Sequence, residues 1–273
     1  MDKQLLNKRE LYKWTTSVLR EYSIKPLKKL SQSFVVDPRV IDDFLNRIEP
    51  GLTTIEIGAG LGTLSYFLVD YCKNKVLLYE IDYRLVKLLR EIIDKPNAII
   101  INSDALLHEW LVEQLVSNTP YSITTNILVK LARSNCIRKA VLVLQKDVVN
   151  RLVSKPGTRN YGRITVLINS VFKIKPGRVY PPSSFYPPPE VSSQIIVLER
   201  VRDYDSEIAL LEEVTRRLFS KRRRRVVKVL NEEFGLDEKT ITSIIPDRDL
   251  RVYELNTGDF LRIVDLVKNY GLN

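Results

Sequence analysis

The segment Glu56-Ile57-Gly58-Ala59-Gly60-Leu61-Gly62 decides the fold of this 273-residue chain. It follows the apolar stretch Thr53–Ile57 and opens the helical pattern Leu61–Tyr71. Glycines between a strand and a helix let the backbone turn tightly and approach a ligand closely. A dinucleotide site needs its third glycine where Thr63 stands, and a phosphate loop needs a Lys after Gly62. Both of these ligands therefore fit the turn badly.

Strands and helices alternate on the C-terminal side of this turn. The predicted strands are Thr53–Ile57, Val76–Ile81, Ala98–Ile101, Gln114–Ser117 and Ala140–Gln145. The predicted helices are Leu61–Tyr71, Tyr83–Ile93, Thr124–Ser134 and Asp147–Val153. This alternation predicts an α/β fold with a mainly parallel sheet and helices on both faces. Two later strand candidates, Val171–Ile174 and Gln194–Leu198, predict an antiparallel pair at one edge.

The two ends of the chain predict helices only. Residues 3–22 form an amphipathic pattern, and a second helix is expected from the Asp37-Pro38 start to about residue 47. Residues 205–273 have almost no strand pattern and predict several short helices. We therefore expect a domain over residues 1–202, with residues 1–25 as a helical extension, and a small all-helical domain over residues 203–273.

Carboxylates follow the second and third predicted strands. Glu80 comes at the end of one strand, where it can accept both hydroxyls of a ribose, and Asp104 follows the next, where it can accept from an adenine amine. A glycine turn, a ribose acid and an adenine acid at three successive strand ends suit an adenosyl ligand that has no pyrophosphate. S-adenosylmethionine is the ligand of this kind that the sequence predicts.

The fourth strand end carries Asn118-Thr119-Pro120-Tyr121. An amide oxygen and a backbone carbonyl there can accept the two protons of a flat exocyclic amine, while the tyrosine stacks on the ring that bears it. Together with a net charge of +10, this motif predicts methylation of a nucleobase in a polyanion.

Composition excludes several other classes of protein. With one histidine, His108, and two distant cysteines, Cys72 and Cys136, the chain has too few ligands for a typical zinc site and lacks a catalytic triad, so no metal is expected. There is no apolar run of membrane-spanning length and no signal-peptide pattern near Met1, so we expect a cytoplasmic protein with no membrane partner.

Basic residues gather in residues 216–228, where eight of thirteen residues are Lys or Arg and none is acidic. Apolar residues at helical spacing on either side predict a packed helix or pair of helices with a cationic face. Uncompensated positive charges repel one another, which favours a phosphate partner, and Lys221, Arg222, Arg223, Arg224 and Arg225 are the predicted RNA contacts. A second basic loop, Arg159–Arg163, is equally consistent with RNA guidance and with a plain surface loop.

From about Leu27 to its end, the chain resembles the ribosomal RNA adenine N6-dimethyltransferases, as an archaeal-like member. The motifs that carry the resemblance are Leu30–Phe34, Glu56–Gly62, Glu80–Asp82, Ser103–Leu106, Asn118–Tyr121, Leu144–Val148, Tyr161–Arg163 and Phe185–Val191. The resemblance implies a Rossmann-like class I methyltransferase sheet with a small helical C-terminal domain. It also implies dimethylation of two adjacent adenosines near the 3′ end of small-subunit rRNA, in ribosome biogenesis.

The family also implies a role for each matching residue. Gln32 and Phe34 would line the mouth of the donor site, and Gly58 and Gly60 would pass under the methionine part of S-adenosylmethionine. Glu80 with Ile81 would hold the ribose, and Asp104 with Ala105 the adenine. Asn118 and Pro120 would grip the target amine, while Tyr121 and Phe185 would sandwich the target base.

The chain departs from the family at four positions near these pockets. The family usually has Gly at Ser31, Asn or His at Ser33, Gly at Ser103 and Leu at Thr119. These differences motivate an alternative, an rRNA-binding factor of small-subunit assembly with weak or lost methyl transfer. A related methyltransferase acting on large-subunit rRNA is a third hypothesis, for which the basic C-terminal domain and the Phe-Tyr-Pro-Pro-Pro segment are less suited. In the leading hypothesis, the partner is small-subunit rRNA in an immature small subunit.

Overall fold

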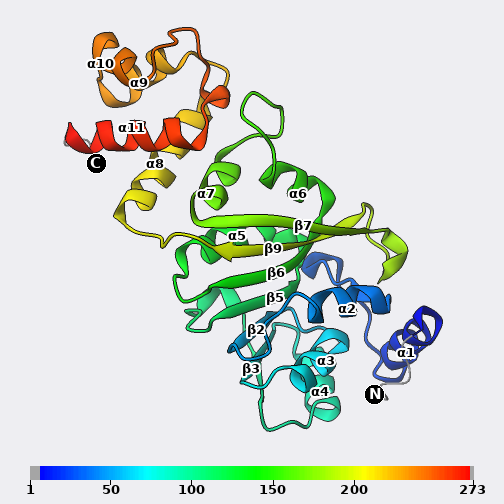
Figure 1. Ribbon diagram of the computed structural model, residues 1–273. Coiled ribbons are helices and arrows are strands. Elements are labelled where there is room, and N and C mark those ends of the chain that lie inside the picture. The colour runs from blue at the N-terminus through cyan, green and yellow to red at the C-terminus, as the bar shows by residue number, and fades with distance from the viewer. Residues whose placement is uncertain (1–6, 271–273) are drawn as a thin grey trace. The chain divides into compact units, whose positions relative to one another are not determined.

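The computed structural model describes residues 7–270 and divides into two compact units (Figure 1). The first unit runs to Val149 and includes Ile174–Arg200, and the second contains Asn150–Lys173 and the chain from Val201 onward. The expected boundary after residue 202 lies two residues from the division at Arg200. Asn150–Lys173, however, was expected in the first domain and groups instead with the C-terminal helices.

A seven-stranded sheet forms the centre of the fold. In spatial order its strands are β4 (Ala98–Asn102), β3 (Val76–Glu80), β2 (Thr54–Ile57), β5 (Gln114–Asn118), β6 (Lys139–Gln145), β9 (Ser193–Arg200) and β7 (Phe172–Tyr180). The five strands from β4 to β6 are parallel, and β9 is antiparallel to β6. The predicted α/β fold with a mainly parallel sheet is therefore confirmed, with all five of its predicted parallel strands.

The helices of the first unit lie between these strands in the sequence. They are α1 (Lys8–Glu21), α2 (Pro38–Leu45), α3 (Thr63–Tyr71), α4 (Tyr83–Ile92), α5 (Thr124–Arg133) and α6 (Lys146–Leu152), the last of which extends into the second unit. The predicted start at Asp37 is confirmed, because its carboxylate accepts a hydrogen bond from the backbone N–H of Arg39 at 3.1 Å. Residues 3–6 of the first predicted helix lie outside the described residues.

One hydrophobic core joins α2 and α3 to the sheet. Phe44 of α2 and Leu68 of α3 are fully buried with Leu78 of β3 and Val141 of β6. Truncating a buried phenylalanine such as Phe44 to alanine typically costs about 3–5 kcal/mol, because the cavity left behind refills only partly. This packing holds the ends of the central strands in fixed positions.

The second unit is helical apart from the start of β7. Its helices are α7 (Arg163–Val171), α8 (Ser206–Ser220), α9 (Val226–Phe234), α10 (Glu238–Ile244) and α11 (Thr257–Asn269). The short helices predicted after residue 205 are confirmed, whereas α7 was not predicted. The strand expected at Val171–Ile174 is β7, which begins at Phe172 and continues to Tyr180.

A two-stranded sheet forms a second, smaller feature of the first unit. β1 (Phe34–Val35) pairs antiparallel with β8 (Phe185–Tyr186), so that Phe34 lies opposite Tyr186. This pairing was not predicted, because two-residue strands have no detectable periodicity. It ties the segment before β1 to the proline-rich segment that follows β8.

The strand order places four sequence motifs along one edge of the sheet. The strand order changes direction at β2. β3 and β4 lie on one side of β2, and the chain then crosses to the other side, where β5 pairs with β2. In open parallel sheets, ligands bind beyond the carboxyl ends of the strands at such a reversal. The turn after β2, Glu80, Asp104 and Asn118 all follow or end strands at this edge.

Candidate functional site

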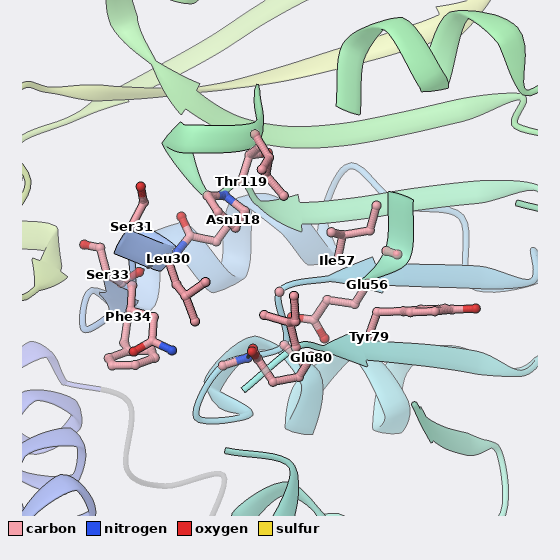
Figure 2. Close-up of a pocket in the computed structure, with 18 of the residues that line it drawn as sticks. Leu30, Ser31, Ser33, Phe34, Glu56, Ile57, Tyr79, Glu80, Asn118 and Thr119 are labelled. Carbon is pink, nitrogen blue, oxygen red and sulfur yellow. Dashed lines mark hydrogen bonds between the residues drawn. The ribbon is translucent and has the colours of Figure 1, made fainter. Parts of the chain in front are cut away.

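A cavity lies at the carboxyl ends of β2, β3, β4 and β5, and Figure 2 shows part of its wall. It contains about 1060 Å³ of space, part of which is open to solvent. Phe34 and Ser33 stand on one side of the view, Glu56 and Tyr79 on the other, with Asn118 between them. The predicted residues that line it are Gln32, Phe34, Gly58, Gly60, Glu80, Ile81, Asp104, Ala105, Asn118, Pro120 and Tyr121. The structure thus brings nearly all of the predicted donor and target residues into one cavity.

The glycine turn forms the floor of this cavity. Gly58, Gly60 and Gly62 have φ values of +77°, +61° and +77°, which L side chains rarely adopt. A Cβ at Gly60 would lie 3.1 Å from the Phe34 ring, and one at Gly58 would lie 3.3 Å from Pro120. Glycine is needed both for the backbone conformation and for the narrow space between this turn and its neighbours.

Glu80 is held rigidly at the end of β3. Its two carboxylate oxygens accept backbone N–H groups from Gly60 and Asp82, each at 2.8 Å. The side chain is buried, and this burial raises the pKa of Glu80 above its usual value despite the hydrogen bonds. Each carboxylate oxygen can accept a further hydrogen bond, so Glu80 can bind a pair of hydroxyls from a fixed position.

Beyond β4, Asp104 forms the next part of the wall. One of its carboxylate oxygens accepts the backbone N–H of Leu106 at 2.9 Å, and within residues 7–270 no hydrogen bond to the other oxygen is found. Ile81, which is 51% exposed, supplies an apolar surface in the same cavity. The arrangement suits a flat ring that has an amine at its edge.

His108, the single histidine of the chain, is exposed and contacts this wall. Its Nε2 lies 2.7 Å from the Ser103 hydroxyl, and Ser103 lines the cavity. The histidine therefore holds the side chain of Ser103, a residue at which the family usually has glycine.

Gln32 has a positioning role in addition to lining the cavity. Its side-chain oxygen accepts the backbone N–H of Leu27 at 2.7 Å, and its amide nitrogen donates to Asp82 at 2.9 Å. Asp82 also pairs with Arg84 at 2.6 Å, and the hydrogen bond from Arg84 is the main reason why the pKa of Asp82 is lowered. Gln32 thus fastens the segment before β1 to the end of β3.

Asn118 ends β5 with its amide orientation set by a neighbour. Its Nδ2 donates to the backbone carbonyl of Ser33 at 2.8 Å. The side-chain oxygen is then left as an acceptor, and within residues 7–270 no hydrogen bond to it is found. This is the orientation that acceptance of an amine proton requires.

The Pro120 carbonyl, predicted to accept the second amine proton, is already engaged. It accepts the backbone N–H of Ile123 at 3.2 Å and the Thr124 hydroxyl at 3.3 Å, so the short helix after Asn118 occupies both of its lone pairs. The role of this carbonyl as an acceptor for the amine therefore stays a prediction, with two donors already bound to it. The neighbouring Thr119 carbonyl accepts no hydrogen bond among the described residues, and Thr119 lines the cavity (Figure 2).

Of the two predicted stacking residues, only Tyr121 lines the cavity. Its hydroxyl shares a hydrogen bond with Ser193 at 2.7 Å, and burial raises the pKa of this phenol. Phe185 is only 2% exposed and packs in the core with residues of α2 and α3. Phe185 does not line this cavity, so its predicted contact with the target base stays a prediction.

Sequence reasoning assigned no role to Glu56, which the structure places in the cavity wall. It is 2% exposed and accepts a hydrogen bond from the Ser65 hydroxyl at 2.6 Å. Burial, and to a smaller extent the nearby Glu80, raise the pKa of Glu56 to about 8. A carboxylate inside the glycine motif was the only available signal, and neither its burial nor its partner could be read from the sequence.

Two of the serines at which the chain departs from the family link the cavity segments. The Ser33 hydroxyl donates to the Pro187 carbonyl at 2.7 Å, and the Ser31 hydroxyl accepts the backbone N–H of Ser122 at 3.3 Å. Ser31 has a φ of +51°, a conformation that glycine adopts at lower cost. The side chains that replace the family residues therefore take part in holding the target side of the cavity together.

The basic run, the second predicted site, lies mostly in a turn. Lys221–Arg225 connects α8 to α9, so the prediction of a pair of helices is correct but the cations lie between them. The charges were expected to be uncompensated, which is wrong for several of them. Lys221 pairs with Glu232 at 3.0 Å and Glu233 at 2.6 Å, and Arg225 pairs with Asp249 at 3.0 Å.

Arg224 also pairs with Glu232, and Arg216 and Arg217 both pair with Glu213, at 2.6 Å and 2.7 Å. The acidic partners come from outside the run, where the sequence pattern did not reveal them. Within the described residues, no group of three or more His, Cys, Asp or Glu side chains could hold a metal ion, and no helix is long and apolar enough to cross a membrane.

Three comparisons with known proteins agree with this geometry. A family model described as ribosomal RNA adenine dimethylase matches residues 25–269. The chain is 32% identical over 268 residues to a probable ribosomal RNA small subunit methyltransferase A of Thermococcus kodakarensis, covering 94% of this chain and 95% of the relative. It is 33% identical to the ribosomal RNA small subunit methyltransferase A of Aromatoleum aromaticum, over 88% of this chain and 93% of the relative.

Solved structures show the same fold. A dimethyladenosine transferase from Plasmodium falciparum superposes with a TM-score of 0.76 at 21% identity, covering 87% of this chain and 98% of that chain. The 23S rRNA methyltransferase ErmE superposes with a TM-score of 0.67 at 24% identity, covering 86% of this chain and 99% of that chain. At these identities, the likeness concerns the fold.

Proposed function

The chain belongs to the ribosomal RNA adenine dimethylase family, and from this premise we propose that it dimethylates N6 of two adjacent adenosines near the 3′ end of small-subunit rRNA. S-adenosylmethionine is the methyl donor of this family. The observation that carries the proposal is the Asn118 amide, which is fixed by Ser33 so that its oxygen remains an acceptor in the cavity floored by the glycine turn.

The cavity fits S-adenosylmethionine on three grounds. Gly58 and Gly60 line the cavity without a side chain, so the backbone of the turn can lie against the donor. Glu80 presents a fixed carboxylate for the ribose hydroxyls, and Asp104 with Ile81 suits the adenine amine and ring. When bound, the donor supplies an electrophilic methyl group on a sulfonium.

Asn118 and its neighbour would prepare the target nitrogen for attack. The adenine amine is a poor nucleophile, because its lone pair is delocalised into the ring. The Asn118 oxygen would accept one of its protons and the Thr119 carbonyl the other, which orients the amine and favours a more tetrahedral nitrogen. As the new N–C bond forms, the bond between that methyl group and the sulfonium would break and leave a neutral thioether. The nitrogen would then be acidic and its proton would pass to solvent, so no strong base is needed. Orientation of this kind contributes several kcal/mol to lowering a barrier.

Tyr121 would hold the target base by stacking. Its hydroxyl is fixed by Ser193, so the ring has a defined position in the cavity wall. Stacking of a base on an aromatic side chain contributes about 1–3 kcal/mol. The base must leave its own stack to reach this cavity, as in other enzymes that modify bases.

The RNA contacts remain part of the proposal. An rRNA is the partner that family membership supports, and we propose the immature small subunit in the cytoplasm as its setting. Lys221 and Arg222–Arg225 are proposed to contact RNA phosphates, with the turn between α8 and α9 as their support.

Mass spectrometry of rRNA nucleosides tests the proposal. Immature small subunits are incubated with the protein and S-adenosylmethionine, and we expect dimethyladenosine at two adjacent positions with the wild type and far less with Asn118→Ala in the same time. If the wild type binds both donor and RNA but forms no methylated adenosine, the alternative of an assembly factor without methyl transfer is correct instead.

A further inference from the structure

Charge is distributed unevenly within the second unit. Residues 201–273 contain 14 Lys and Arg residues and 14 Asp and Glu residues. Residues 150–173, which group with them, contain five Lys and Arg residues and no acidic residue. The net positive charge of this unit therefore comes from residues 150–173 and not from the run of arginines that stands out in the sequence.

Ion pairing distinguishes individual cations of this unit, and within residues 150–173 Arg163 pairs with Glu212 at 3.0 Å. Lys221, Arg224 and Arg225 each have a carboxylate partner within 3.0 Å, which an incoming phosphate would have to displace. Among residues 7–270, no ion pair is found for Lys155 or Arg159, and both side chains are exposed. These two cations are available to a polyanion without the loss of an existing pair.

The backbone of the loop that carries Lys155 and Arg159 is held in place by the basic turn. The Arg222 guanidinium donates to the carbonyls of Arg159 at 3.1 Å and Thr158 at 3.3 Å. It also lies over the ring of Tyr253, 5.5 Å from its centre, and Tyr253 accepts the backbone N–H of Gly157 at 2.8 Å. The Arg222 guanidinium thus donates to neutral carbonyls, and no carboxylate partner for it is found within the described residues.

We propose that Lys155 and Arg159, together with Arg222 and Arg223, form a composite surface that binds the phosphate backbone of the RNA substrate. This inference rests on the proposed function, and it assigns the strongest phosphate contacts to the loop at residues 155–159. Arg223 is exposed, and no ion pair of its side chain is found in the described part of the chain. Contacts with phosphates position a protein on RNA without selecting a sequence.

The salt dependence of RNA binding tests this surface. Two variants of equal charge change are compared, Lys155→Ala/Arg159→Ala and Arg224→Ala/Arg225→Ala, with a fragment from the 3′ end of small-subunit rRNA as the probe and no donor present. Each lost phosphate contact lowers the slope of log K against log salt by about 0.7 to 0.9. For Lys155→Ala/Arg159→Ala, we expect the slope of log K against log salt to fall in magnitude by about 1.5. For Arg224→Ala/Arg225→Ala, we expect a decrease of less than about half of that.

The slope is the decisive readout, because removing a paired arginine also leaves a carboxylate that repels RNA and lowers affinity by itself. All four positions are exposed, so melting temperatures close to the wild-type value are expected and serve as the folding control. Equal slopes for the two variants, or a larger loss for Arg224→Ala/Arg225→Ala, would overturn the composite surface.

Methyl transfer by the wild type to the same RNA is measured separately. Suppose that the wild type methylates the RNA but Lys155→Ala/Arg159→Ala has the same slope of log K against log salt as the wild type. The proposal of a composite surface is then wrong, and the proposed function is unaffected. A loop-dependent slope without any methyl transfer supports the surface and counts against the proposed function.

Discussion

The cavity at the strand ends and the basic turn between α8 and α9 hold their polar groups in different ways. In the cavity, Glu80 and Asn118 are fixed by backbone groups and keep an acceptor site for a ligand. In the turn, Lys221 and Arg225 are bound by other charged side chains at the surface. Backbone partners orient a group without neutralising it, whereas ion pairs neutralise the charge that a ligand would use. Polar residues predicted from a sequence motif are therefore more reliable indicators of ligand binding in the cavity than in the basic turn.

The largest expected effect tests the cavity. Asn118→Ala removes the acceptor for the target amine while leaving the glycine turn, Glu80 and Asp104 in place. We expect methyl transfer to fall by about 10²–10³-fold or more, as when a positioned polar group is removed from an active site. Single-turnover assays measure the rate, and calorimetry should give a nearly unchanged donor affinity. A variant that retains its rate would place the amine elsewhere.

Glu80→Ala tests whether the Glu80 carboxylate, which already accepts two backbone N–H groups, also binds S-adenosylmethionine. Loss of hydrogen bonds to a charged group costs about 1.5–3 kcal/mol each, so donor affinity should fall by roughly 10- to 100-fold. Calorimetric titration with S-adenosylmethionine measures this. Glu80→Gln is the matched control, since it keeps the shape and one acceptor and should lose less. Unchanged affinity in both variants would remove Glu80 from the donor site.

Glu56 tests the cost of burying a carboxyl group beside Glu80. Its pKa is raised to about 8 in the folded protein, so its contribution to stability is fully present below pH 4.5 and is lost as the pH rises through about 8. Glu56→Gln has no proton to lose. Relative to the wild type, we expect it to gain roughly 4 kcal/mol of unfolding free energy between pH 5 and pH 9, at about 1.36 kcal/mol for each unit of pKa. Urea denaturation across this range measures the difference, and parallel pH profiles would contradict it.

The smallest expected effect tests the turn. Glu232→Gln removes the carboxylate shared by Lys221 and Arg224, so Arg224 becomes available to RNA while Lys221 keeps its pair with Glu233. We expect RNA affinity to rise a few-fold and its salt dependence to steepen by less than about 1, because exposed ion pairs are weak. Filter binding at several salt concentrations measures both. Glu238→Gln, at another exposed acid of this unit, is the control.

The sequence by itself determined most of the first unit and the location of the cavity. The alternation of strands and helices is set by local hydrophobic periodicity, and motifs that follow parallel strands must meet at one edge of the sheet. For this reason the sequence alone predicts that Gly58, Glu80, Asp104 and Asn118 lie close together in the fold.

Tertiary structure alone decided the features that depend on contacts between distant segments. The burial of Phe185, the occupied Pro120 carbonyl and the raised pKa of Glu56 each arise from neighbours that local pattern does not specify. The grouping of Asn150–Lys173 with the C-terminal helices and the ion pairs of the basic turn are of the same kind. A linear sequence shows which charges are present, but only the fold determines which of them face one another, because Coulomb interactions depend on distance in space.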